Sequence, residues 1–179
     1  MHFSTVSIIR QPVELVWNIM CDQFPQIGDL IDEIDYIRRE DLRQLENGDI
    51  ETVHIWKSSP DLPAMVKKFI QPDMLSWTDT ALWKSREFVC EWKIDSHYFQ
   101  KGLKCSGRTV FEPAIGGRGC RLTFAGDLHW EGGGLPAGMG LLGDFISKGL
   151  EPLMGQLLPG NFRKITQAVE TLIAAQSQG

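Results

Sequence analysis

The chain has 179 residues and a formal net charge of −5, with 42% hydrophobic and 23% charged residues. This length suffices for one domain with a full hydrophobic core, and the composition excludes disordered and fibrous proteins. The acidic balance argues against a nucleic-acid partner, because nucleic-acid-binding proteins usually present a basic face. No run of 18 apolar residues occurs, so we expect no integral membrane segment.

The cysteines and the first residues bear on the compartment. Cys21, Cys90, Cys105 and Cys120 are widely spaced. The N-terminus has no basic region followed by an apolar core, so we expect a cytoplasmic protein with reduced cysteines. A zinc site needs clustered ligands, and the sequence has no CxxC or HxxxH pair, so we expect no metal.

The first 31 residues predict one strand and two helices. Residues 2–10 are rich in β-branched types and predict a strand. Pro12 then suits the start of a helix, where its missing N–H has no partner to lose. A second, shorter helix is expected over residues 24–31. The first helix has an apolar face at helical spacing, formed by Val13, Val16, Trp17 and Met20.

The middle of the chain predicts antiparallel strands. Asn47-Gly48 predicts a hairpin between the first two, because both residue types tolerate positive φ. Apolar residues alternate with charged ones in two of the strands, as expected when one face of a sheet is buried. The predicted strands cover residues 34–41, 50–57, 75–83, 87–94, 104–112 and 120–131.

Two further segments do not follow the strand pattern. Residues 58–72 carry three prolines, and we expect a surface loop with a short helix capped by Asp61, forming a mobile edge of a pocket. After the glycines at 132–134 the chain is expected to be helical, with Pro159-Gly160 interrupting its apolar stripe. The last helix should lie across the apolar face of the sheet.

This order of elements is the helix-grip order. The opening IIRQPVELVWNIMCD resembles the START-like (SRPBCC) superfamily, which includes the birch pollen allergen and the polyketide cyclases. The segments SSPDLPAMVKKFIQPDMLSWTDTALW, GRTVFEPAIGGRGCRLTFAGDLHW and ISKGLEPLMGQLL resemble a bacterial family of uncharacterised members. The resemblance covers nearly the whole chain.

The resemblance implies an α+β fold in one domain, residues 1–179. A curved antiparallel sheet of about six or seven strands would wrap on a long C-terminal helix, with two short helices after strand 1. It also implies a deep cavity between the sheet and that helix, open to a small apolar ligand.

The other sequence motifs carry little information about function. Residues 138–143 match GxGxxG, but no strand precedes them and no βαβ unit can form, so we expect a glycine-rich start of a helix and no cofactor. Neither GxxxxGK[ST] nor GxSxG occurs, which argues against a P-loop and a hydrolase nucleophile. Cys105 and Ser106 lie in a predicted strand without a neighbouring base, so packing is their expected role.

Aromatic residues dominate the expected inner face of the sheet, either as solid core or as the walls of a cavity. His54 alternates with Thr52 and Trp56, while Val53 and Ile55 occupy the other face, and the pattern leaves open which face points inward. We assign no catalytic residue. The candidate ligand contacts are His54, Trp56, Trp77, Trp83, Phe88, Trp92, Phe111, Phe124, Trp130 and Phe145.

Three classes of function fit these sequence features. The preferred one is binding or transport of a small hydrophobic molecule, lipid-like or aromatic, in the cavity. The alternative is a cyclase- or aromatase-like enzyme, for which Asp79 or His54 would have to lie in the cavity with a shifted pKa. The third is an interaction protein with a filled core and an exposed apolar patch. The oligomeric state is left open.

Overall fold

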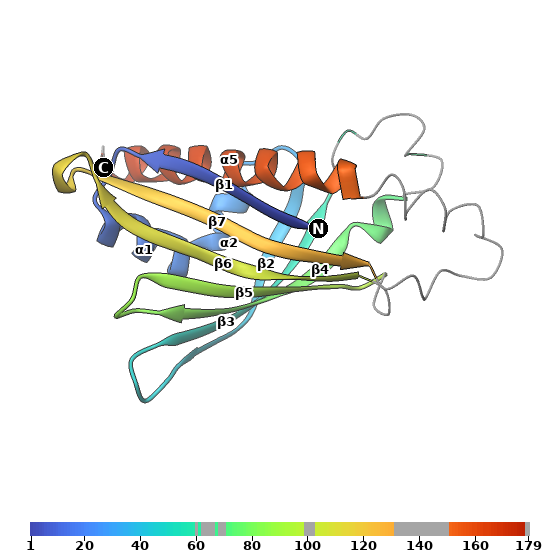
Figure 1. Cartoon of the computed structure of the whole chain (residues 1–179), viewed down its shortest axis with the longest axis horizontal. Coiled ribbons are helices and arrows are strands. Elements are labelled where there is room, and N and C mark those ends of the chain that lie inside the picture. The colour runs from blue at the N-terminus through green and yellow to red at the C-terminus, as the bar shows by residue number, and fades with distance from the viewer. Residues whose placement is uncertain (60, 62–66, 68–70, 99–102, 131–150, 178–179) are drawn as a thin grey trace.

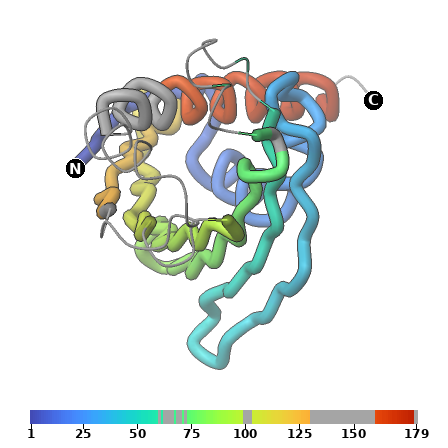
Figure 2. The backbone as a smooth tube through the Cα atoms, turned by 90° about the vertical axis from the view of Figure 1, so that its right-hand side faces the viewer, coloured from blue at the N-terminus to red at the C-terminus, as the bar shows by residue number. Residues whose placement is uncertain are grey.

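The computed structural model describes residues 1–59, 61, 67, 71–98, 103–130 and 151–177, without the side chains of residues 72, 130 and 151–159. Within this part of the chain, seven strands form one antiparallel sheet in the order β1-β7-β6-β5-β4-β3-β2. The sheet is curved, with α1 and α2 inside the curve and α5 running across the opening (Figures 1 and 2). The predicted helix-grip arrangement of sheet and helices is confirmed.

The strands are β1 (His2–Ile9), β2 (Ile34–Gln44), β3 (Ile50–Ser58), β4 (Ser76–Lys84), β5 (Val89–Ser96), β6 (Leu103–Ala114) and β7 (Gly119–Trp130). The helices are α1 (Val13–Asp22), α2 (Phe24–Gly28) and α5 (Glu151–Gln176), with short 3₁₀ helices η1 (Pro72–Met74) and η2 (Ile115–Gly117). None of these helices is long and apolar enough to cross a membrane.

Helix α1 is fixed to the sheet by its predicted apolar face. Pro12 is its N-cap, and Val13, Val16, Trp17 and Met20 are all buried. The Trp17 ring makes edge-to-face contacts, with centroid distances of 5.2 Å to Trp83, 5.3 Å to Phe88 and 5.1 Å to Phe111. These contacts hold the middle of α1 against β4 and β6.

Helix α2 is shorter than predicted. It ends at Gly28, where an added Cβ would lie 2.7 Å from the side chain of Ile37 on β2. This close approach needs glycine, a poor helix former, so the chain turns there instead of continuing to residue 31. The β2–β3 hairpin forms as predicted, but of its Asn-Gly pair only Gly48 has a positive φ, of 87°.

The predicted interruption at Pro159-Gly160 is wrong, because α5 continues through both positions. A proline inside a helix lacks one backbone hydrogen bond and costs about 3 kcal/mol relative to alanine. The following turns bury Phe162, Val169 and Ile173, each at most 3% exposed. Burying such side chains contributes about 1.5–3 kcal/mol each, which outweighs the cost of the proline.

Several predictions lie outside the described residues. The short helix expected between 58 and 72 is one, since only Asp61 and Lys67 are described between 60 and 70. The GxGxxG match at 138–143 and Phe145 are others.

The four cysteines are free and buried, and burial raises the pKa of Cys21 to about 11 and of Cys105 and Cys120 to about 12.

Candidate functional site

A cavity lies between the inner face of the sheet and the helices, with about 990 Å³ of space between atoms, including the part open to solvent. Its aromatic lining comes from strands and helices alike: Phe24, Trp56, Trp77, Trp83, Trp92, Phe111, Phe124 and Phe162. The aliphatic lining is Met20, Ile31, Ile34, Ala81, Ile94 and Ile165. The other lining residues are Glu33, Ser58, Asp79, Cys90, Thr109 and Asn161.

The indole rings are fixed by contacts between strands. Trp56 on β3 and Trp77 on β4 are paired in register and stack with their centroids 5.6 Å apart. Trp83 Nε1 donates a buried hydrogen bond of 3.0 Å to Thr52 Oγ1. These rings are therefore oriented before any ligand arrives, which lowers the entropy lost on binding.

Two glycines make room for the Trp92 ring. Gly107 on β6 and Gly126 on β7 face each other, and an added Cβ on either would lie 2.6 Å from the Trp92 ring. Phe124 stacks on Trp92 at 4.8 Å and on Phe162 of α5 at 4.6 Å. The sheet and α5 thus touch through this stack at one end of the cavity.

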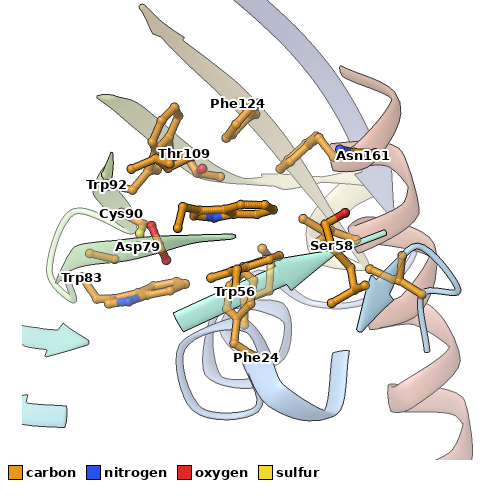
Figure 3. Close-up of a pocket in the computed structure, with 18 of the residues that line it drawn as sticks. Phe24, Trp56, Ser58, Asp79, Trp83, Cys90, Trp92, Thr109, Phe124 and Asn161 are labelled. Carbon is orange, nitrogen blue, oxygen red and sulfur yellow. The ribbon is translucent and has the colours of Figure 1, made fainter. Parts of the chain in front are cut away.

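Asp79 brings a carboxyl group into the cavity from the middle of β4. Figure 3 shows it beside Cys90, with Trp83 and Trp92 on either side. No described residue forms a hydrogen bond or an ion pair with its carboxylate, and desolvation raises its pKa from 3.8 to about 7. Asp79 can therefore hold or release a proton near neutral pH.

The negative charge of Glu33, the other carboxylate that lines the cavity, is compensated by a lysine. Lys164 Nζ on α5 donates a hydrogen bond to Glu33 Oε1, and this bond lowers the pKa of Glu33 below its usual value. Ser58 Oγ donates to the backbone carbonyl of Glu33 at 2.7 Å. The connection between α2 and β2 is thereby tied to both β3 and α5.

The inward face of β3 is the one that carries Thr52, His54 and Trp56, which are all buried. His54 is nevertheless not among the residues that line the cavity, contrary to expectation. Its ring packs against Phe24, with centroids 5.8 Å apart, and neither ring nitrogen has a partner in the described part of the chain. Desolvation, followed by the charge of Arg39, lowers its pKa to about 4. His54 is thus a neutral core residue.

The other predicted ligand-contact residues fall into those that line the cavity, one that does not, and two whose side chains are not described. Six of them line the cavity: Trp56, Trp77, Trp83, Trp92, Phe111 and Phe124. Phe88 does not, because its φ of 53° at the turn into β5 turns its ring onto Trp17. The Trp130 side chain and Phe145 lie outside the described residues. That any of these residues contacts a ligand stays a prediction.

Sequence reasoning missed the lining residues contributed by the helices. Phe24 and Phe162 occupy apolar positions of predicted helices, but helical spacing does not tell which apolar residue faces a hollow. Glycine in the interior of a strand, as at 107 and 126, was the available signal for a close approach of a large ring. In the described part of the chain, no three His, Cys, Asp or Glu side chains are grouped so as to hold a metal ion.

No protein-family model matches the chain, and no curated protein sequence matches it either. Solved structures do match. The Zhui aromatase/cyclase from Streptomyces sp. R1128 aligns at 15% identity over 97% of this chain and 95% of its own, with a TM-score of 0.68. TTHA0849 from Thermus thermophilus aligns at 14% identity over 96% and 99%, with a TM-score of 0.67.

A third match is a START superfamily protein from Mycobacterium smegmatis, at 14% identity over 98% of both chains, with a TM-score of 0.57. The chain has the START-like fold. At these identities the likeness to START-like proteins concerns the fold alone. The narrower resemblance to one bacterial family of START-like proteins stays a prediction.

Proposed function

We propose that the protein binds a small hydrophobic molecule, lipid-like or aromatic, in the cavity between the sheet and the helices. The observation that carries this proposal is a cavity with eight aromatic rings among its described lining residues. Ligand sites in proteins are lined mostly by apolar and aromatic groups with few polar ones. Removing apolar surface from water would contribute about 25 cal/mol per Å². An open cavity of this kind argues against an interaction protein with a filled core.

A cyclase- or aromatase-like enzyme is the second candidate, and Asp79 is the observation that favours it. A carboxyl group with a pKa of about 7 in an apolar cavity can act as a general acid or base at neutral pH. The structural match to a protein named as an aromatase/cyclase supports the same candidate. The neutral His54, packed behind Phe24, offers no partner in the cavity. Mass spectrometry of a bound molecule, before and after its incubation with the protein, separates the two candidates. A carrier releases the molecule unchanged, whereas an enzyme changes it.

Binding is tested by isothermal titration calorimetry with 2-naphthylmethanol, a neutral two-ring alcohol. We expect saturable binding of one molecule per chain. The Ile94→Trp variant adds an indole to the cavity lining and should weaken binding at least about tenfold, which corresponds to about 1.4 kcal/mol. Ile55→Trp is the matched control, because Ile55 lies on the opposite face of the sheet.

Far-UV circular dichroism verifies that both variants fold. Absence of binding to the unmodified chain contradicts the proposal. So does an equal loss of affinity in Ile94→Trp and Ile55→Trp, because the loss would then not depend on the cavity.

A further inference from the structure

The charges that line the cavity are of one sign. Among the described lining residues, Asp79 and Glu33 are the ionisable acids, and no lysine, arginine or histidine is present. Glu33 is paired with Lys164, whereas Asp79 has no hydrogen-bonded or ionic partner in the described part of the chain. The interior therefore presents one carboxyl group without a compensating cation.

The rings around this carboxyl group favour the same sign of ligand charge. Trp77 and Trp83 share the inner face of β4 with Asp79, and Figure 3 shows Trp92 on its other side. The face of an indole ring carries partial negative charge and attracts cations within about 6 Å of its centre. Carboxylate and indole faces together form the kind of surroundings in which proteins bind organic ammonium groups.

We propose that the ligand is an apolar molecule bearing one protonated amine or quaternary ammonium group, with its nitrogen held between the Asp79 carboxylate and the indole faces. This inference rests on the proposed binding function and narrows its ligand class. It disfavours anions such as a carboxylic acid in its ionised form. Such an anion would meet a like charge at Asp79 and no positive side chain among the described lining residues.

None of the described titratable groups near Asp79 carries a charge that would attract or repel a cationic ligand. His54 is opposite Asp79 on β3, Cys90 lies beside it on β5, and Cys105 is the nearest thiol on β6. His54 is neutral at physiological pH because its pKa is lowered, and both thiols are neutral because theirs are raised. From the described helices, none of the lining residues carries a charge: they are Met20, Phe24, Asn161, Phe162 and Ile165.

Binding of a cation must therefore depend on pH through Asp79. Its pKa of about 7 describes the cavity without a cation, where the carboxyl group is largely protonated below neutrality. A cation stabilises the ionised form, so binding expels the proton. Affinity for an amine should rise with pH through about 7 and then level off.

Three probes that share one naphthalene ring test the proposal by isothermal titration calorimetry at pH 8. They are 2-naphthylmethylamine, which is a cation at this pH, the neutral 2-naphthylmethanol, and the anion 2-naphthoate. We expect the amine to bind at least about tenfold more tightly than the alcohol, and the anion to bind most weakly. In Asp79→Asn the ratio between amine and alcohol should fall to about one. In the unmodified chain at pH 5.5 the ratio should also fall.

Asp95→Asn is the matched control, because Asp95 lies on the outer face of β5 and does not line the cavity. It should keep the preference for the amine. Equal affinities for amine and alcohol, or a preference that survives in Asp79→Asn, overturn the inference while binding of the alcohol still supports the proposed function. Failure of all three probes to bind overturns both.

Discussion

In the Asp79→Asn variant, the free energy of unfolding is expected to rise with pH between pH 4 and pH 6.5, whereas the unmodified chain should show a much flatter profile. His54 stays neutral in the fold down to a pKa of about 4, but takes up a proton near 6.5 when unfolded, so its contribution to stability rises with pH in this window. Asp79 keeps its proton in the fold up to about 7 but loses it near 3.8 when unfolded, so its contribution falls. The two slopes, each about 1.4 kcal/mol per pH unit, have opposite signs and cancel.

Urea unfolding followed by far-UV circular dichroism at pH 4, 5, 6.5 and 8 measures this effect. All other titrating groups are common to both chains, so the difference between them isolates Asp79. At pH 8 the variant should be more stable by up to about 4 kcal/mol, since an ionised carboxylate no longer has to be desolvated. His54→Gln should show the opposite behaviour, with stability falling as pH rises. Parallel profiles for Asp79→Asn and the unmodified chain would contradict the assignment of a raised pKa to Asp79.

The second large effect is expected at Gly107, where alanine should lower the free energy of unfolding by about 3 kcal/mol or more. The added Cβ would lie 2.2 Å from the carbonyl oxygen of Ala125 and 2.6 Å from both Gly126 Cα and the Trp92 ring. Two of these three atoms belong to the backbone of β7, so no change of side-chain rotamer relieves the overlap. Urea unfolding at constant pH measures the loss.

Gly160→Ala is the matched control for this experiment. It adds the same methyl group within α5, where an added Cβ would meet no atom of the described residues within 4 Å. Alanine is favoured over glycine in a helix by about 1 kcal/mol, so this variant should be more stable than the unmodified chain. A cost at Gly107 no greater than that of an ordinary surface substitution would falsify the close packing described for β6 and β7.

The sheet could be predicted because its signals are local. In β5, Cys90 and Trp92 face inward while Glu91 and Lys93 are exposed, as alternation indicates when helices cover one face of an antiparallel sheet. The course of α5 through Pro159 could not be predicted in this way. The local rule for proline favours a break, and the packing that overrides it joins α5 to residues far away in the sequence.

The candidate site was predictable only in part, for a similar reason. Alternation identifies the side of a strand on which a residue lies, and Trp77, Asp79 and Trp83, which are spaced for one face of β4, do line the same cavity. It does not tell what covers that residue, and His54 faces inward but packs against Phe24 of α2. The absence of a partner for the Asp79 carboxylate likewise depends on what the other elements present, which no pattern within β4 contains.

Four of the six tryptophans of the chain line one cavity, and this gives the protein an intrinsic optical reporter. Emission from an indole responds to the polarity and the quenching groups within a few ångströms of its ring. An occupant of the cavity would alter several emitters at once, and an acceptor dye bound there would receive energy from all four. The arrival and departure of a guest can therefore be timed by stopped-flow without attaching any label.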